Sequence, residues 1–316
     1  MPNTTPLVYI VMVNFNGYKD TIEGLESMKN VHYDNYKMVI VDNGSQDNSI
    51  ERLVEWAERN SLDFELIEAE CIINSKYEVE KKIVFIRSKK NGGYAYGSNL
   101  GIKLAIVNGA DYILVMNNDI VVSPDFLEPL VEMCERDDTI GIVSGKIYFY
   151  NKPNVIWSNG GAFNKWTGKL EHFNFNEFDI GQLPQKEISF LSGCMWLIPR
   201  QVFEKIGLIN EEYFMYMEDL EFCYRVLKSG YKLAVNPESK IWHKIGSSVG
   251  LWSKLGAYWT GRNKIKFILE NITGFPKLTS LVYQLFYTPL WWALKGRFDL
   301  AIEYIKGAWK WILKKS

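Results

Sequence analysis

Short runs of apolar, β-branched residues alternate with amphipathic helical patterns through the first half of the chain. Five of these runs predict buried strands, at residues 7–14, 38–42, 83–88, 112–117 and 140–150. Between the first four strands, apolar residues recur with helical spacing, which predicts helices at about 18–28 and 49–60, and a third that follows the NGGYAYGS stretch at 91–98 and ends near residue 108. Strands that alternate with helices form crossover units, so we expect an α/β fold with a mixed, mainly parallel sheet and flanking helices.

The regular alternation ends near residue 150. Glycines and aromatic residues beyond it predict twisted antiparallel strands and loops, followed by helices at about 199–207 and 218–230. Residues 68–82 are too many for an ordinary connection between a helix and a strand, and they predict an inserted hairpin or loop.

The C-terminal segment combines apolar and basic residues. Residues 278–294 carry no charge, but this run is shorter than the ~20 residues that a spanning helix needs, and Pro289 interrupts it. We expect an in-plane or partly inserted segment. The last 17 residues, 300–316, interleave Ile302, Ile305, Trp309 and Ile312 with lysines, which is the pattern of an amphipathic helix on an anionic surface.

Charge distribution separates this tail from the rest of the chain. Residues 264–316 hold nine Lys or Arg against three Asp or Glu, so the tail is net +6 and the remainder net −7. The 316 residues together are nearly neutral, so the chain has no net positive electrostatic field that would attract nucleic acid. We expect membrane association through residues 275–316. The alternative is packing on the tail's own domain or on a partner subunit, such as a second copy in a homo-oligomer.

The four cysteines are far apart, which excludes a zinc knuckle and a dithiol motif and indicates free thiols in a reducing compartment. The N-terminus enters an apolar strand without a basic stretch, so we predict no signal peptide. These features predict a cytoplasmic protein that is peripheral on the inner face of the cell membrane.

Three of the predicted strands end in polar residues. The ends read NFNG at 14–17, DNGSQD at 42–47 and NND at 117–119, and ligands of such sheets bind beyond the carboxyl ends of the strands. Asp42 suits hydrogen bonds from a base or ribose, or else caps a helix. Asp119 suits a hard cation on phosphates, or else a capped turn. His243 is a distant candidate ligand, although a lone histidine also has structural uses.

The stretch MYMEDLEFCYR, residues 215–225, brings three carboxylates to the start of a predicted helix. Acids in a first turn suit the positive end of the helix dipole, and Glu221 can pair with Arg225 four residues on. Asp219 is explained less well in this way, because it borders the apolar stripe of the helix.

Taken in order, several motifs resemble those of the inverting glycosyltransferases of family 2, which have the GT-A fold, and most closely the rhamnosyltransferase-like members. The motifs are VNFNG, VDNGSQD, NGGYAYGSNLG, MNNDI, SGCMWLIPR, YMEDLEFCYR and WHKIGSS. The resemblance implies a Rossmann-like GT-A domain over 1–262, with a nucleotide-binding half at about 1–120 and an acceptor-side half at about 121–262. The basic, aromatic helical tail, 263–316, lies outside it.

The resemblance also implies roles for individual residues. The residues implied to bind the nucleotide sugar are Asn14, Asp42, Asn91, Gly93, Asn99, Asn118 and Asp119. The metal ligands implied for Mg²⁺ or Mn²⁺ are Asp119, His243 and Asn117, of which Asn117 stands where the family motif has a first Asp, a change that weakens metal affinity. Asp219 matches the catalytic base, with Glu218 supporting it or holding the acceptor.

Two further residues are expected on the acceptor side. Trp196 in SGCMWLIPR either stacks on a sugar or fills core, and Arg262 matches a basic position that contacts diphosphate or a lipid-phosphate acceptor.

The expected reaction moves a sugar, with rhamnose as a candidate, from a UDP- or dTDP-sugar to a hydroxyl of a glycan or lipid-linked acceptor. One alternative is direct transfer to a polyprenyl phosphate. A nucleotidyltransferase should carry a basic triphosphate loop, and the first strand end has none before Lys19. A non-catalytic protein that binds sugar nucleotides with a degenerate metal site is favoured by Asn117 and opposed by the retained Asp119 and Asp219.

Overall fold

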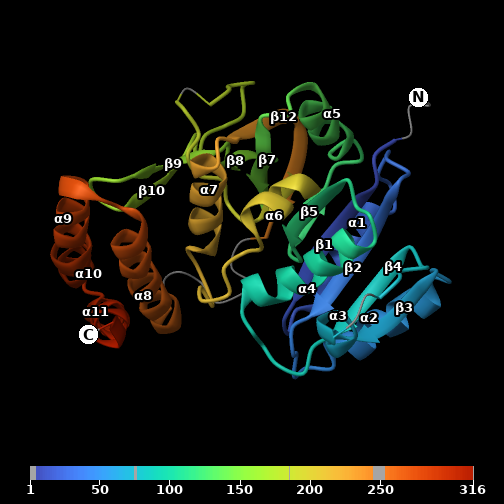
Figure 1. Ribbon diagram of the computed structural model, residues 1–316, viewed down its shortest axis with the longest axis horizontal. Helices are drawn as coiled ribbons and strands as arrows, with labels where there is room; N and C mark the ends of the chain where they lie inside the picture. The colour runs from blue at the N-terminus through green and yellow to red at the C-terminus, as the bar shows by residue number, and fades with distance from the viewer. Residues whose placement is uncertain (1–4, 75–76, 185, 245–252, 316) are drawn as a thin grey trace.

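The computed structural model describes residues 5–74, 77–184, 186–244 and 253–315. Within them, one sheet runs in the order β3-β4-β2-β1-β5-β11-β7-β12-β6, with β8 paired to β7 (Figure 1). The five predicted strands are all present: β1 (Val8–Asn14), β2 (Tyr36–Asp42), β4 (Ile83–Arg87), β5 (Tyr112–Asn117) and β7 (Ile140–Phe149). The first four are mutually parallel where they pair, as expected.

Both faces of this sheet are covered. Every residue of β1 is buried, and its alternate side chains enter two separate apolar clusters. Val8, Ile10 and Met12 pack into one cluster, and Tyr9 and Val11 pack into the other. Since successive side chains of a strand point to opposite faces, helices must cover both faces. They include α1 (Tyr18–Met28) and α2 (Ser49–Arg59), close to the predicted ranges, and α4 (Tyr94–Val107), which ends near the predicted residue but begins earlier, within the NGGYAYGS stretch.

Residues 64–74 differ from the prediction. They form an edge strand, β3 (Phe64–Glu68), and a short helix, α3 (Ala69–Asn74), where a hairpin or loop was expected from residue 68. β3 pairs in parallel with β4 and has only one fully buried residue, so its sequence carries little apolar signal.

The second half adds antiparallel strands to the sheet, as predicted. β11 (Met195–Pro199) runs antiparallel to β5, and β6 (Ile120–Val122) runs antiparallel to β12 (Lys232–His243). β8 (Lys152–Ser158) pairs antiparallel with β7. A separate hairpin is formed by β9 (Gly161–Asn164) and β10 (Lys169–His172). The helices of this half are α5 (Glu128–Arg136), α6 (Arg200–Ile206) and α7 (Glu218–Lys228).

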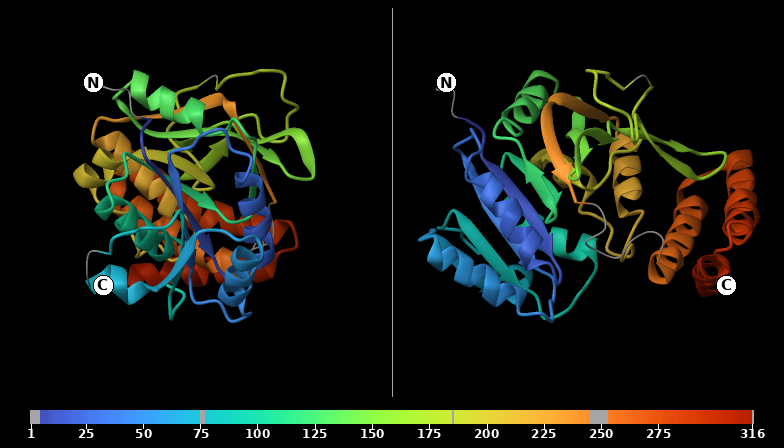
Figure 2. Two further views of the ribbon diagram at one scale, coloured as in Figure 1. Left: turned by 90° about the vertical axis from the view of Figure 1, so that its right-hand side faces the viewer. Right: turned by 180° about the vertical axis from the view of Figure 1, so that it is seen from behind.

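The C-terminal helices form one end of the molecule, far from β3 and β4 at the other end (Figures 1 and 2). They are α8 (Lys254–Asn271), α9 (Gly274–Val282), a π-helical turn at Tyr283–Tyr287, α10 (Thr288–Leu294) and α11 (Phe298–Lys315). Helix α8 is continuous through residues 262 and 263, so the predicted domain boundary falls inside a helix. Among the described segments, no helix is both long and apolar enough to cross a bilayer.

Helices α8 and α11 touch at two glycines. A Cβ on Gly261 would lie 2.2 Å from the Tyr304 carbonyl oxygen, and a Cβ on Gly307 would lie 2.0 Å from that of Tyr258. The two backbones are therefore in direct contact. Helix α11 of the tail packs on α8 through these contacts, as in the alternative in which the tail packs on its own domain. Another face of the tail stays exposed.

Candidate active site

The carboxyl ends of β1 and β2 bring Asn14 and Asp42 together. The two residues lie opposite each other in the parallel register of the strands. Asn14 Nδ2 donates a 2.8 Å hydrogen bond to Asp42 Oδ1, and Ser45 donates to the same carboxylate from its hydroxyl and its backbone N–H. Asp42 is only 2% exposed. This network fixes a carboxylate at the sheet edge where α/β proteins bind ligands.

Asn118 joins this network from the end of β5, which is parallel to β1. Its Nδ2 donates to Thr21 Oγ1 at 2.9 Å and lies 3.5 Å from Asn14 Oδ1. Thr21 in turn donates to Asn14 Oδ1 at 2.9 Å. Asn14 and Asn118, both expected near a nucleotide, thus lie in one hydrogen-bonded cluster.

The loop before α4 is held against β2 and also contacts the segment before α7. Asn43 Nδ2 donates to Asn91 Oδ1 at 3.1 Å and to the Gly93 carbonyl at 3.0 Å. Gly93 has φ +88°, and a Cβ there would lie 2.3 Å from the Phe214 carbonyl oxygen. Only glycine combines this backbone conformation with so close an approach.

Asn99 has a different environment from the one expected. Its Nδ2 donates to the Ile209 carbonyl and to Glu211 Oε1, both at 2.8 Å, and its Oδ1 accepts from the Ile209 N–H. Asn99 is 2% exposed. Its amide braces α4 against residues 209–211, and these bonds use both of its N–H groups.

Asp119 and His243 form a buried ion pair. His243 Nε2 lies 3.1 Å from Asp119 Oδ1. Cys194 Sγ is 3.6 Å from His243 Nδ1 and 3.7 Å from Asn117 Nδ2, so the thiol contacts two of the predicted metal ligands. Burial lowers the pKa of His243, but contacts with Cys194 and Asp119 outweigh burial and raise it. These contacts therefore favour the protonated form of the His243 imidazole in this pair.

The part of the chain that the structure describes has no group of three or more His, Cys, Asp or Glu side chains arranged to hold a metal ion. A metal at Asp119 and His243 would take its remaining ligands from water or substrate. The residues 245–248 of the WHKIGSS motif lie outside the described residues.

Helix α7 begins in a strained turn. Tyr216 and Met217 have φ +64° and +71°, in the left-handed region that non-glycine residues rarely adopt. Such strain persists where the surrounding structure imposes it and is common at functional sites. The turn delivers Glu218 and Asp219 to the first positions of α7.

The two carboxylates at the start of α7 are poorly solvated. Asp219 Oδ1 accepts from the Leu220 N–H at 2.8 Å, and Asp219 Oδ2 is 3.4 Å from the Gly193 N–H. Within the described residues, Glu218 Oε2 is buried and has no hydrogen-bond partner. Burial raises the pKa of both carboxyl groups, and the negative charge of Asp219 raises that of Glu218 further. Strongly raised pKa values of this kind cluster at functional sites.

Glu221, the third acid of this turn, has the structural role predicted for it. Its Oε1 accepts from Arg225 Nε at 2.8 Å, and Arg225 also donates to the carbonyls of Ile206 and Leu208. The pair ties α7 to the end of α6.

Comparison with known proteins identifies the family. The profile of the family described as Glycosyl transferase family 2 matches residues 9–207, well over half of the chain. The chain belongs to this family. It is a glycosyltransferase, as the motifs predicted. A second profile, Glycosyl transferase family group 2, matches residues 112–312 and so extends through most of the tail.

Curated relatives of this glycosyltransferase include a rhamnosyl transferase. The dTDP-rhamnosyl transferase RfbF of Shigella flexneri is 26% identical over 270 residues, covering 78% of this chain and 86% of that protein. The low-salt glycan biosynthesis hexosyltransferase Agl10 of Haloferax volcanii is 27% identical over 48% of each chain. The chain spans about half the length of Agl10 and of the poly-β-1,6-N-acetyl-D-glucosamine synthase of Staphylococcus aureus.

Solved structures confirm the GT-A fold. The mannosyltransferase PcManGT from Pyrobaculum calidifontis, in complex with GDP-Man and Mn²⁺, superposes with a TM-score of 0.59 at 16% identity, over 97% of this chain and 76% of its own. GalNAc-T7 with UDP, GalNAc and Mn²⁺ gives a TM-score of 0.58 at 15% identity, over 94% of this chain and 59% of its own.

Trp196 of the glycosyltransferase fills core and does not face an acceptor. Its side chain is 0% exposed and stacks on Phe222 of α7, with ring centroids 5.7 Å apart. Because both faces of the sheet are covered, alternate residues of β11 are buried on opposite sides. The expectation of sugar stacking at Trp196 is wrong for this reason.

Arg262 connects the tail to the segment before α7. It donates to the Glu212 carbonyl at 3.0 Å, and its guanidinium lies 5.2 Å from the Trp259 ring and 5.0 Å from the Trp311 ring. These contacts give Arg262 a bracing function between α8, α11 and the loop at 209–217.

Several residues of the site were not predicted. Cys194, Thr21 and Ser45 connect the predicted residues through hydrogen bonds and short contacts. Ser45 follows Asp42 in a turn-forming sequence, which is a usable signal. Cys194 and Thr21 have none, since their partners lie far away in the chain.

Proposed function

We propose that the protein is an inverting glycosyltransferase that moves a sugar from a nucleotide-diphosphate sugar to a hydroxyl of a lipid-linked or polysaccharide acceptor. Family membership supports the reaction class, and the Asn14, Asp42 and Asn118 cluster supports a nucleotide site at the sheet edge. RfbF, named a dTDP-rhamnosyl transferase and aligned over 78% of this chain, makes dTDP-rhamnose the first donor to test.

One observation carries this proposal: a short segment joins the two candidate reaction centres. The Gly193 N–H lies 3.4 Å from Asp219 Oδ2, and the next residue, Cys194, contacts His243, which pairs with Asp119. A carboxylate suited to take a proton therefore lies beside a pair suited to the diphosphate. Glycosyl transfer needs both functions around one anomeric carbon.

Asp219 serves as the general base in this mechanism. The acceptor hydroxyl oxygen bonds to the anomeric carbon while its proton passes to the Asp219 carboxylate. The bond from that carbon to the diphosphate breaks, and its electron pair leaves with the nucleoside diphosphate. One direct displacement inverts the anomeric centre and needs no carboxylate nucleophile. Burial raises the pKa of Glu218, and the charge of Asp219 raises it further, so in this mechanism Glu218 holds the proton of the pair and Asp219 is the ionised partner.

Asp119 and His243 would hold a divalent cation, Mg²⁺ or Mn²⁺, with Asn117 beside them. The donor set fits such an ion, because a hard cation on a diphosphate uses few protein oxygens and keeps water or phosphate at its other positions. When bound, the ion supplies countercharge for the leaving diphosphate. His243 would have to lose its proton to coordinate the ion, so the affinity for the metal should fall as the pH is lowered.

Donor binding is expected to raise the melting temperature. A ligand at 100 times its Kd adds about 2.7 kcal/mol, which corresponds to several degrees for a chain of this size. dTDP-rhamnose, UDP-sugars and GDP-sugars are compared with and without Mn²⁺. Asp42→Ala should remove the shift, whereas Asp47→Ala, at an exposed neighbour, should keep it. An unchanged donor shift in Asp42→Ala would reject the nucleotide role of Asp42.

The acid limb of the pH profile of kcat/KM should lie at a higher pH than a free aspartate would give. The reaction requires ionised Asp219, and burial raises its pKa above the ~3.9 of a free aspartate. As the pH is lowered, activity should therefore begin to fall well before pH 4 is reached. Initial rates measured between pH 4.5 and 9 test this. A rate that stays constant down to pH 4.5 would contradict the assignment.

The tail supports a membrane setting for this reaction. Exposed apolar side chains of α9, the π-helical turn, α10 and α11 include Phe275, Leu278, Phe286, Leu290 and Ile302, each more than half exposed. Lysines accompany them, and the tail is net basic. This combination suits the surface of an anionic bilayer, where a lipid-linked acceptor is located.

A further inference from the structure

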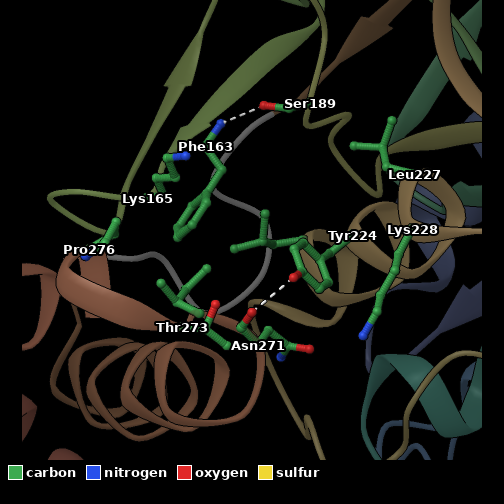
Figure 3. Close-up of a pocket in the computed structure, with 11 residues that line it drawn as sticks. Phe163, Lys165, Ser189, Tyr224, Leu227, Lys228, Asn271, Thr273 and Pro276 are labelled. Atoms are coloured by element: carbon green, nitrogen blue, oxygen red, sulfur yellow. Dashed lines mark hydrogen bonds between the residues drawn. The ribbon is translucent and has the colours of Figure 1, made fainter. Parts of the chain in front are cut away.

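A cleft of about 490 Å³ lies between the β9–β10 hairpin, helix α7 and the turn from α8 to α9 (Figure 3). Its lining divides into an apolar part and a cationic part. The apolar lining residues are Phe163, Leu220, Tyr224, Leu227, Ile272 and Pro276. The cations are Lys165 and Lys228, which Figure 3 shows on opposite sides of the cleft, and none of the described residues that line it is a carboxylate.

The two lysines are uncompensated. Both are exposed, and within the residues that the structure describes neither forms an ion pair with a protein carboxylate. Two ammonium groups above an apolar floor suit an amphiphile whose head group is a phosphate or diphosphate. A purely polar anion would leave the apolar floor in contact with water.

The cleft borders the exposed apolar surface of the tail. Pro276 in its lining follows Phe275, which is 66% exposed and makes an edge contact with Trp166 at a centroid distance of 6.3 Å. Trp166 lies at the tip of the β9–β10 hairpin and is 48% exposed. Exposed aromatic rings of this kind are favoured at the interface of a membrane with water. A ligand in the cleft can therefore keep its hydrocarbon chain in the bilayer.

The cleft also shares helix α7 with the proposed catalytic base. Leu220 lines it and is the residue after Asp219. Tyr224, one turn further along α7, donates a 2.8 Å hydrogen bond to the Asn271 carbonyl and so fixes the cleft wall to the end of α8 (Figure 3).

We propose that this cleft binds the phosphate-bearing end of a lipid-linked acceptor, with Lys165 and Lys228 on the phosphate and the apolar floor on the first part of the hydrocarbon chain. This inference rests on the proposed function and names the acceptor class. It also extends the membrane-facing surface beyond residues 275–316 to the hairpin tip at Trp166.

Titration calorimetry with farnesyl diphosphate tests the proposal on the full chain. The double variant Lys165→Ala/Lys228→Ala should bind at least about 10-fold more weakly than wild type, a loss of ~1.4 kcal/mol. The control Lys152→Ala/Lys240→Ala removes two exposed lysines elsewhere and should bind as wild type does. Hydrogen exchange should show ligand protection of peptides that cover 163–165 and 224–228.

Two further ligands separate the possible sources of affinity. Inorganic diphosphate and farnesol should each bind at least about 10-fold more weakly than farnesyl diphosphate, because each offers one half of the interaction. Equal affinity of inorganic diphosphate would overturn the proposal in favour of a simple anion site. Equal affinity of the lysine double variant, or no binding by wild type, would also overturn it. The assay needs no donor and no turnover, so its failure is distinguishable from failure of the donor screen.

Discussion

Asp219→Asn is expected to lower kcat for sugar transfer by about 100- to 10,000-fold, the usual contribution of a general base. The amide keeps the size of the side chain and can still accept from the Leu220 N–H, but it cannot take the proton of the acceptor hydroxyl. Donor binding should remain near wild type, because the Asp42 cluster is separate from α7. The measurements are kcat under saturating donor and acceptor and the donor-induced shift in melting temperature.

Thermal stability distinguishes this role from a structural one. Burial raises the pKa of Asp219 above its value in the unfolded chain. At a pH above the unfolded-state pKa, the ionised carboxylate therefore lowers the free energy of unfolding. Asp219→Asn should therefore melt no lower than wild type at pH 8, and the difference should shrink as the pH falls toward ~3.9. Loss of activity together with a clear loss of stability would indicate a structural role instead.

Glu221→Gln is the matched control in the same helical turn. It removes one negative charge from the first turn of α7 but keeps an oxygen that can accept from Arg225. Its kcat should stay within a few-fold of wild type. A loss as large as that of Asp219→Asn would mean that the charge of the turn matters, and not the base.

The sheet edge of the site was predictable because local patterns determine it. Apolar runs set the strands, polar residues follow them, and the parallel register then brings Asn14 opposite Asp42. β3 was missed for the opposite reason, since four of its five residues are only partly buried or exposed and give no apolar run.

Contacts between distant segments were not predictable from local patterns. The glycine-rich loop indicated a close backbone approach, but not that Gly93 meets Phe214 beside α7. Cys194 reads as an ordinary buried thiol in the sequence, whereas in the fold it lies between Asn117 and His243. Trp196 suits a sugar platform or a core equally well until the helices on both faces are known.

The tail was predicted as an amphipathic surface, and the structure divides its residues between two faces. Leu300, Tyr304 and Trp311 are buried in the interior formed with α8, whereas Ile302 and Trp309 are exposed. Deleting residues 275–316 would uncover that interior and destabilise α8, so it cannot isolate the membrane role. Substitutions confined to the outward face avoid this difficulty.

Replacing four outward side chains of the tail with glutamate is expected to abolish binding to anionic vesicles. The residues are Leu278, Phe286, Leu290 and Ile302, which are between 52% and 70% exposed. A fully inserted Leu, Ile or Phe side chain gains about 1.5–3 kcal/mol, so losing four of them, even if only partly inserted, should lower the partition coefficient by more than ~100-fold. Co-sedimentation with vesicles containing phosphatidylglycerol measures this.

The matched control replaces Phe175, Phe178, Ile180 and Leu183 with glutamate. These four are between 52% and 87% exposed and lie in the loop after β10, so the change in charge and apolar area is similar. Vesicle binding should survive in the control and weaken with added salt, since lysines of the tail contribute to it. If the tail variant instead keeps vesicle binding but changes from dimer to monomer in solution, the outward face is an interface between copies of the chain and the membrane proposal fails.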